Sequence, residues 1–314
     1  METILSVEHL MISFSQYERG WRKTQLPVIR DLSVNIKEHE IVAVVGSSGS
    51  GKSLLAHAVM GLLPANASWS GTISFEGEEL TQKRVKELRG NRMVLVPQSV
   101  SYLDPLMKVG DQVRKGHKDE ASRARSREVT GRYGLGEETE ELYPFQLSGG
   151  MTRRILISTA VMEKPKLVIA DEPTPGLHIS AAKRVLSHFR EIADEGAGVL
   201  LITHDLGVVA ETSDRVAVIY AGEILEYGSR EDIFLHPSHP YTVGLFHSLP
   251  GMNSQARRLK PITGSPPDPT DLPEGCAFAP RCPHAKGGCS KGKIEFREIA
   301  PGHFCRCGLK QKED

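Results

Sequence analysis

One glycine- and serine-rich loop has the residue types and spacing that suit phosphate chemistry. It consists of Gly46, Ser47, Ser48, Gly49, Ser50, Gly51, Lys52 and Ser53. The glycines let consecutive backbone N–H groups surround phosphate oxygens, and a helix beginning here directs its positive dipole end at the same anion. Lys52 supplies a charge to the terminal phosphates, and Ser53 supplies a hydroxyl for Mg²⁺. The pattern predicts a nucleoside triphosphate site, with a flexible turn as the alternative.

Two adjacent carboxylates, Asp171 and Glu172, follow the apolar run at 167–170. In a phosphate-hydrolysing site, Asp171 would hold Mg²⁺ through water and Glu172 would polarise the attacking water. Alone, the pair reads equally well as a solvated acidic turn after a strand. The phosphate loop elsewhere in the chain favours the hydrolytic interpretation.

A weaker signal is the run from Leu147 to Met151, which contains Ser148, Gly149 and Gly150. It precedes an expected helix, so its backbone N–H groups could receive an anion. Ser-Gly-Gly is also an ordinary turn sequence, so the run is not informative by itself.

The elements that would position these residues alternate between strands and helices. Continuous apolar runs predict buried strands at 41–45, 93–96, 167–170 and 199–202. Alternating patterns predict half-buried strands at 4–8 and 31–36, with a polar loop containing Tyr17 and Trp21 between them. A further strand is expected at 72–75, helices at 53–63 and 181–193, and a hairpin at 216–226. This order predicts an α/β fold with a mostly parallel sheet and helices on its faces.

Composition changes divide the chain into parts. Residues 99–146 are polar and helix-prone, as at 115–127, and are expected to form a small helical subdomain within an ATPase-sized domain of 1–235. Residues 236–314 are rich in Pro, Gly and Cys and are expected to form a separate, loop-rich extension.

The overall charge is balanced, with 39 Lys and Arg against 39 Asp and Glu. Balance argues against a dedicated nucleic-acid binder, which usually carries a basic excess. No apolar run approaches the roughly 18–20 residues that span a bilayer, and the first residues lack a secretory pattern. We therefore expect a cytosolic protein whose membrane role, if any, comes through a partner.

All five cysteines lie after residue 275, at Cys276, Cys282, Cys289, Cys305 and Cys307. Such clustering in a cytosolic chain suggests metal or cluster binding more than disulfides. Several thiolates at short spacing suit a [4Fe–4S] cluster or zinc, and free thiols remain the alternative.

The order of these motifs resembles the ABC transporter ATP-binding family over nearly the whole chain. Residues 46–53 match its Walker A motif, 167–172 its Walker B motif with the catalytic glutamate, and 147–151 its signature. Gln98 falls at the Q-loop position and His204 at the switch histidine. Phe14 falls where the family stacks an aromatic ring on adenine, although core packing is the competing explanation.

The resemblance implies a P-loop NTPase (RecA-like) core with an antiparallel β subdomain, ATP as ligand and Mg²⁺ held by Ser53, Gln98 and Asp171. It also implies a head-to-tail pair of subunits in which Ser148, Gly149 and Gly150 act on the ATP bound by the partner. Glu172, His204 and Gln98 would be the catalytic residues.

Two residues depart from the family pattern. Met151 replaces a glutamine at the end of the signature, a change that also occurs in the peptide-importer branch. His178 replaces the D-loop aspartate that helps couple the two ATP sites, and an imidazole has no permanent negative charge. The departure puts the coupling between sites in doubt.

The tail resembles the C-terminal extension of the oligopeptide, dipeptide and nickel importer branch, through the runs 236–242, 262–267 and 278–283. That likeness implies a [4Fe–4S] cluster on Cys276, Cys282, Cys289 and Cys307, with Cys305 as an alternative ligand and zinc as an alternative metal. It implies transmembrane permease partners, a second ATP-binding subunit (identical or similar), an indirect solute-binding partner and a peripheral position on the cytoplasmic face of the membrane. Peptides or related small solutes would be the cargo, with nickel possible.

Two other classes of function were weighed. A soluble ABC-type ATPase acting on nucleic acid or ribosomes usually has long coiled-coil insertions or two fused ATPase domains, and this chain has neither. A regulatory subunit with a degenerate site gains some weight from His178, but Lys52, Asp171, Glu172 and His204 are all present.

Overall fold

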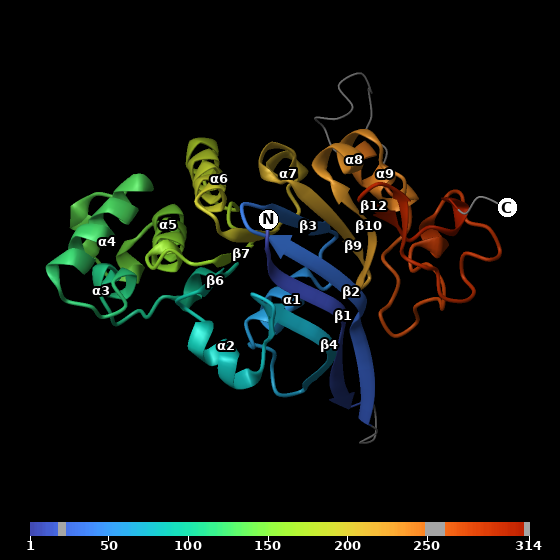
Figure 1. The fold of residues 1–314 in the computed structure, drawn as a ribbon, viewed down its shortest axis with the longest axis horizontal. Helices are drawn as coiled ribbons and strands as arrows, with labels where there is room; N and C mark the ends of the chain where they lie inside the picture. Colours follow the sequence, from blue (N-terminus) through green and yellow to red (C-terminus); the bar gives the residue numbers. More distant parts are fainter. Residues whose placement is uncertain (18–22, 249–260, 311–314) are drawn as a thin grey trace.

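The computed structural model describes residues 1–17, 23–248 and 261–310. A large twisted sheet occupies the middle of the molecule, a helical subdomain lies at one end and the C-terminal extension at the other (Figure 1). The fold is mixed α/β, as the sequence predicted.

The sheet joins a parallel part to an antiparallel part. The parallel part has the order β9-β3-β8-β7-β6, and the antiparallel part has the order β5-β4-β1-β2, with β10 between them. The strands of the parallel part and β10 are β3 (Ile41–Gly46), β6 (Met93–Val96), β7 (Leu167–Asp171), β8 (Gly198–Ile202), β9 (Arg215–Tyr220) and β10 (Glu223–Ser229). The antiparallel strands are β1 (Thr3–Tyr17), β2 (Lys23–Lys37), β4 (Ala67–Phe75) and β5 (Glu78–Glu79).

Nine α-helices are found in the described residues. They are α1 (Lys52–Val59), α2 (Gln82–Leu88), α3 (Val109–Val113), α4 (Glu120–Arg132), α5 (Gly149–Val161), α6 (Ile179–Asp194), α7 (Leu206–Thr212), α8 (Arg230–Leu235) and α9 (Pro240–His247). Short 3₁₀ turns lie at 100–102, 137–141, 144–146, 279–281 and 308–310.

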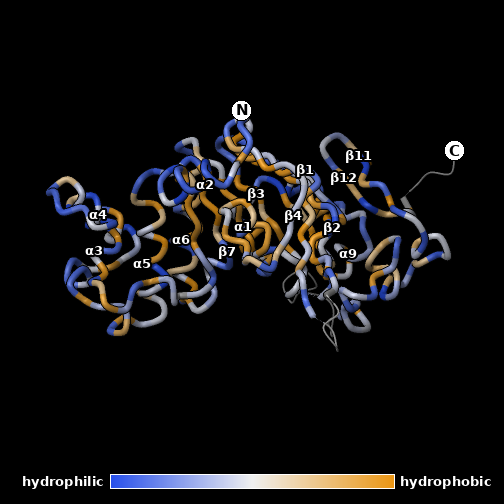
Figure 2. The backbone as a smooth tube through the Cα atoms, turned by 90° about the horizontal axis from the view of Figure 1, so that it is seen from below, coloured by the Kyte–Doolittle hydropathy of each residue, from blue (hydrophilic) through white to orange (hydrophobic). Residues whose placement is uncertain are grey.

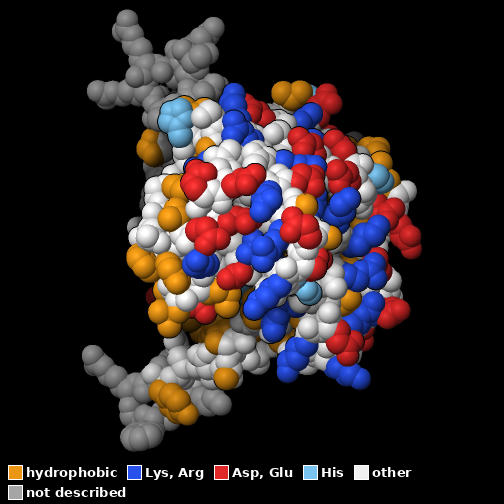
Figure 3. Space-filling model, turned by 90° about the vertical axis from the view of Figure 1, so that its left-hand side faces the viewer, with side chains coloured by type: hydrophobic (Ala, Val, Ile, Leu, Met, Phe, Trp, Pro, Cys, Tyr) orange, Lys and Arg blue, Asp and Glu red, His pale blue; other side chains and the backbone are white. Residues whose placement is uncertain are grey.

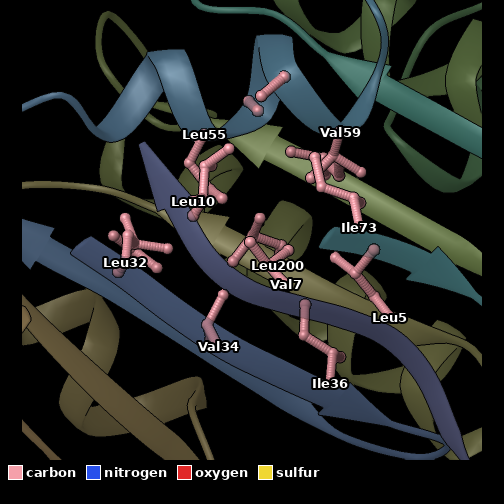
Figure 4. Close-up of a cluster of buried hydrophobic side chains, with 14 of the residues drawn as sticks. Leu5, Val7, Leu10, Leu32, Val34, Ile36, Leu55, Val59, Ile73 and Leu200 are labelled. Carbon is pink, nitrogen blue, oxygen red and sulfur yellow. The ribbon is translucent and has the colours of Figure 1, made fainter. Parts of the chain in front are cut away.

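One hydrophobic core joins the two parts of the sheet through α1. Side chains of β1 and β2 face Leu55 and Val59 of α1, and Leu200 of β8 lies in the same cluster (Figure 4). Along the backbone, the hydrophobic residues concentrate in the central strands and α1 (Figure 2). This packing fixes the end of β3 against α1, where the phosphate loop lies.

The helical subdomain carries interspersed charges and exposed apolar side chains. On the side of the molecule where it lies, Lys and Arg alternate with Asp and Glu (Figure 3). Arg114 bridges Glu140 at 2.8 Å, and Lys108 bridges Glu141 at 2.6 Å. Leu106 and Phe145 are also exposed, at 86% and 74%.

The predicted polar loop between residues 9 and 30 is wrong in the described part. β1 continues to Tyr17, and β2 begins at Lys23, because Leu10, Ile12 and Ile29 are buried and β1 pairs with β2 on one side and β4 on the other. Trp21 lies outside the described residues.

Two helix predictions also need correction. The helix predicted at 53–63 ends at Val59, since Gly61 has φ 61° and a Cβ there would lie 2.9 Å from Val85. The helix expected at 115–127 is α4, which begins after the Asp119 cap, because Lys115 and Gly116 adopt left-handed conformations that end α3.

The C-terminal extension packs against the main sheet. Its strands β11 (Arg297–Ala300) and β12 (His303–Cys305) pair with each other, and β12 pairs with β10 of that sheet. Phe278 and Ala277 share a core with Val45 and Val218 of the sheet. The domain boundary at residue 235 stays a prediction.

Among the described residues, the helices are all too short or too polar to cross a membrane.

Candidate functional site

The candidate site lies where neighbouring parallel strands end. The spatial order β3-β8-β7-β6 places the phosphate loop, His204, the Asp171–Glu172 pair and Gln98 next to one another at the carboxyl edge of the sheet. Ligand sites of open α/β sheets form at this edge. A cavity of about 650 Å³ is lined by these residues, which the sequence had singled out separately.

The phosphate loop is held by both backbone shape and Lys52. Gly46 has no room for a side chain, since a Cβ there would lie 2.1 Å from the carbonyl oxygen of Ile219. The Lys52 Nζ donates to the carbonyl oxygens of Gly46 and Ser47, both at 2.9 Å. Burial lowers the pKa of Lys52, while Glu172 and Asp171 raise it. These contacts hold the Lys52 ammonium group at the loop, next to the place where phosphates would bind.

Asp171 has the features of a cation ligand. Burial raises the pKa of its carboxyl group, against a hydrogen bond from Ser53 that lowers it. Its Oδ1 atom is buried without a hydrogen-bond partner. An orphaned carboxylate oxygen next to a serine hydroxyl is a suitable donor set for Mg²⁺, which prefers oxygen ligands.

Glu172 is fixed by backbone and side chain together. Its φ of 48° is rare for a residue other than glycine, and strain of this kind gathers at functional sites. One carboxylate oxygen lies 2.7 Å from His204 Nδ1, and the other accepts from Thr203 at 3.3 Å. Glu172 and His204 are thus close enough for both to hydrogen-bond to one water molecule.

Gln98 is positioned by an arginine that sequence reasoning did not assign. Arg153 of α5 is 6% exposed and donates to the carbonyl oxygens of Pro97 and Gln98, each at 2.7 Å. Burial lowers the pKa of Arg153, while Asp171 and Glu172 raise it. The helix that follows the signature is therefore tied to the cavity through Arg153.

Several predicted residues do not line this cavity. Ser148 caps α5 by accepting from the Met151 N–H at 3.3 Å, and Gly149 and Gly150 begin that helix. Phe14 is half-buried against the hydrophobic core, so its adenine contact stays a prediction. Ser50 is buried behind the loop.

His178 takes a local structural role. It is exposed, caps α6 and accepts from the Ser180 N–H at 3.4 Å. An aspartate would also cap a helix here, so the change preserves the cap and removes the charge.

The cavity includes residues that carried no sequence signal. Val28, Leu206 and Leu245 line it, and Leu245 comes from α9 of the extension. These are apolar residues of ordinary type, and only the fold brings them to the loop.

The cysteines form no disulfide, and all five lie in the described part of the chain. Burial raises the pKa of the Cys276 thiol to about 11, and the neighbouring Cys307 and Cys282 raise it as well. Burial also raises the pKa of Cys282, with contributions from Cys307 and Cys289. Four of the five thiols therefore lie near one another. Within the described ranges, no three His, Cys, Asp or Glu side chains lie close enough to hold a single metal ion.

Comparison with known families gives two matches along the chain. Residues 29–175 match the family described as ABC transporter. Residues 225–289 match the family described as the C-terminal region of oligopeptide/dipeptide transporters.

Curated relatives match over nearly their full length. The dipeptide transport ATP-binding protein of Bacillus subtilis is 39% identical, over 99% of this chain and 96% of its own. The oligopeptide transport ATP-binding protein of Escherichia coli is 35% identical, over 98% of this chain and 93% of its own.

Solved structures show the same fold. A dimeric ATP-binding cassette bound to ADP and Pi has a TM-score of 0.63 at 22% identity and covers 72% of this chain and 99% of its own. An ATP-binding subunit of an ABC transporter has a TM-score of 0.60 at 25% identity, over 73% and 91% of the two chains.

Proposed function

Since the chain belongs to the ABC transporter family, we propose that it hydrolyses ATP to energise the import of peptides. The observation that carries the proposal is the convergence of Lys52, Asp171, Glu172 and His204 on one cavity. The relatives are named as dipeptide and oligopeptide transport proteins. Those names favour peptides over nickel, and transport over a soluble ATPase acting on nucleic acid or ribosomes or a regulatory subunit.

The roles follow from the geometry. Lys52 exchanges the carbonyl oxygens of its own loop for phosphate oxygens, while the loop N–H groups surround the anion. Glu172 orients the attacking water, and His204 steadies Glu172 through their 2.7 Å contact. Ser53, Gln98 and Asp171 would hold Mg²⁺, which supplies charge neutralisation to the phosphates when bound.

The signature completes a second site. Ser148, Gly149 and Gly150 lie at the start of α5, outside this chain's own cavity. Helix N-termini bind anions, so these N–H groups suit the ATP of a second ATP-binding subunit, identical or similar. ABC transporter relatives of this kind imply dimers and permease partners.

We place the chain on the cytoplasmic face of the membrane, with an extracytoplasmic solute-binding protein as an indirect partner. We propose that the exposed Leu106 and Phe145 of the helical subdomain contact a permease subunit there.

The substitution Glu172→Gln tests hydrolysis. We expect the Kd for ATP to stay within about twofold of wild type. Turnover should fall by about 10²-fold or more, which is the usual rate contribution of a general base. The matched control is Glu87→Gln, an exposed residue of α2 that should change neither quantity. Wild-type turnover in Glu172→Gln refutes its assigned role.

Cargo is tested in cells that lack the gene and need a peptide-borne amino acid. Wild-type protein should restore uptake of a labelled tripeptide, and Glu172→Gln should not. Restoration of nickel uptake alone would replace peptides by nickel in this proposal.

For the extension we propose a [4Fe–4S] cluster on Cys276, Cys282, Cys289 and Cys307. Support comes from the mutual influence of these four thiols: Cys307 and Cys282 raise the pKa of Cys276, and Cys307 and Cys289 raise the pKa of Cys282. Buried neighbouring thiols resist ionisation unless a cation compensates. Each thiolate of a [4Fe–4S] cluster binds its own iron, so the sulfurs need not converge on one point as they would around zinc. When bound, the cluster supplies a structural crosslink.

Anaerobic purification followed by iron and sulfide assay tests the cluster. Cys307→Ser should lose most of the iron, whereas Cys305→Ser should keep it. Stoichiometric zinc without sulfide, or equal iron in the two variants, would overturn the assignment.

A further inference from the structure

One peptide unit of the phosphate loop is held at both of its ends. The carbonyl oxygen of Gly46 accepts from Lys52 Nζ at 2.9 Å. On the other side of the same peptide bond, the Ser47 N–H donates to the hydroxyl oxygen of Tyr241 at 3.0 Å. Because a peptide bond is planar, fixing the N–H end fixes the direction of the carbonyl that holds Lys52.

Aromatic packing holds the Tyr241 hydroxyl in place. Tyr241 lies in α9 and is 1% exposed. Its ring centroid lies 4.6 Å from that of Tyr220 and 5.3 Å from that of Phe278. Arg281 Nη1 in turn donates to the Tyr220 hydroxyl at 3.2 Å. The ring has no room to turn, so its oxygen is a fixed acceptor.

The start of α9 is anchored to β10 of the main sheet and to the extension. His239 Nδ1 accepts from the Tyr241 N–H at 3.0 Å, and the His239 N–H donates to Glu226 at 2.9 Å. His239 Nε2 lies 3.7 Å from the Cys276 sulfur. A continuous series of contacts therefore runs from the cysteine-bearing loop to the phosphate loop.

A second part of the extension lies behind the same loop. Pro266, Pro267 and Leu272 line a small cavity together with Ser47 and Ser48. Leu245, one helical turn after Tyr241, faces the nucleotide cavity itself. Tyr241 thus belongs to a contact surface between the extension and the loop.

We propose that Tyr241 is a positioning residue of the ATP site, which orients the Gly46–Ser47 peptide and through it Lys52. The proposal rests on the assignment of this loop as the ATP site. Without the hydroxyl, the partly buried Ser47 N–H loses its side-chain acceptor, and the loop can turn to satisfy it. The nucleotide then meets a loop that has to be reordered on binding.

The substitution Tyr241→Phe removes the hydroxyl and keeps the ring. We expect the Kd for Mg-ATP to rise roughly three- to tenfold, the range for one buried hydrogen bond. Turnover at saturating ATP should stay within about twofold of wild type, because bound phosphates themselves order the loop. Titration with a fluorescent ATP analogue and steady-state kinetics measure the two effects.

The matched control is Tyr220→Phe, which loses a hydroxyl that accepts from Arg281, while its ring still packs against Tyr241. It should keep the wild-type Kd. Equal weakening in both variants would reduce Tyr241 to a packing residue and overturn the proposal, as would an unchanged Kd in Tyr241→Phe. Wild-type protein that fails to bind ATP would refute the site assignment instead.

Hydrogen exchange of wild-type protein gives an independent test that needs no variant. The Ser47 amide should be protected without nucleotide. Exchange of this amide at the rate of an unstructured chain would overturn the proposal even if Tyr241→Phe failed to fold.

Discussion

The ATP-binding core and the C-terminal extension bury their residues in different ways. In the core, strands β3, β7 and β8 are buried along their whole length and consist almost entirely of apolar residues. In the extension, buried charged groups hold the chain. Arg306 is 5% exposed and bonds to the carbonyl oxygens of Ile224 and Ile294 and to Asp31.

Glu226 is the clearest example of the second kind. It is fully buried and accepts from the Ser238 and His239 N–H groups, at 2.6 and 2.9 Å. Its carboxylate also lies 2.8 Å from His303 Nε2. Apolar packing is non-directional, whereas these bonds fix single atoms. The difference teaches that a loop-rich segment can still place one hydroxyl, that of Tyr241, against the phosphate loop.

The largest effect is expected from Leu200→Ala in the apolar core. Leu200 is fully buried in β8, and the truncation leaves a cavity that should cost about 2–5 kcal/mol of unfolding free energy. Chemical denaturation should show one transition at lower denaturant, because core and extension share the sheet. A separate early transition of the extension would contradict this expectation.

The next effect is expected from Glu226→Ala. Two backbone N–H groups and the His303 ring lose their partner, and water entering the space of the removed side chain replaces part of these contacts, so we expect a total cost of about 1–3 kcal/mol. We expect faster proteolysis within the extension and weaker ATP binding, since α9 carries Tyr241. The control Glu226→Gln keeps an acceptor oxygen and should be milder. If Glu226→Ala leaves both readouts unchanged, the polar contacts are not what holds the extension.

The smallest effect concerns a histidine that packs against an aromatic ring. His188 of α6 lies edge-on to Tyr133, 5.0 Å between centroids, and its Nδ1 lies 3.1 Å from the exposed carboxylate of Glu191, whereas His303 faces a buried carboxylate. Burial lowers the pKa of His188, although Glu191 raises it. As the folded pKa lies below that of the unfolded chain, the unfolded state takes up the proton first, and stability is lost as pH falls through the ordinary value near 6.5.

The substitution His188→Gln removes the titrating group, so it should remove this loss of stability at low pH. Denaturation of both proteins at pH 7.5 and 6 gives the change in unfolding free energy between the two pH values. This change should be smaller in the variant than in the wild type, by less than about 1 kcal/mol. Glu191, Arg132 and Glu195 also face the imidazole group, so both measurements need the same ionic strength. An identical pH effect in the two proteins would show that His188 does not contribute.

The sequence predicted the strands and loops of the parallel sheet well, because each is a continuous apolar run followed by a polar motif. Parallel topology then brings the ends of these strands together, so Lys52, Asp171, Glu172, His204 and Gln98 meet in one cavity. Residues 9–17 were predicted as part of a polar loop, yet Leu10 and Ile12 are buried, and the segment pairs with two neighbouring strands. The apolar residues of this segment were therefore overlooked, because its partly polar composition was taken as the signal of a loop.

Contacts between distant segments were out of reach of sequence reasoning. Tyr241 and Ser47 are far apart in the chain, and neither has a neighbouring residue that marks the hydrogen bond between them. Arg153 was given no role from the sequence, although it donates to the carbonyl oxygen of Gln98. Such roles depend on which surfaces meet after folding.

The pairing of β12 with β10 also has a consequence for synthesis on the ribosome. At about 5–20 residues per second, several seconds separate the emergence of β10 from that of its partner strand near the end of the chain. Until then, Glu226 and Tyr227 present an unpaired strand segment, and unpaired edges invite association with other chains. The phosphate loop of a nascent chain is therefore synthesised early, and the extension whose Tyr241 contacts that loop is synthesised late. The ATP site can reach its final geometry only after the extension has folded onto the sheet.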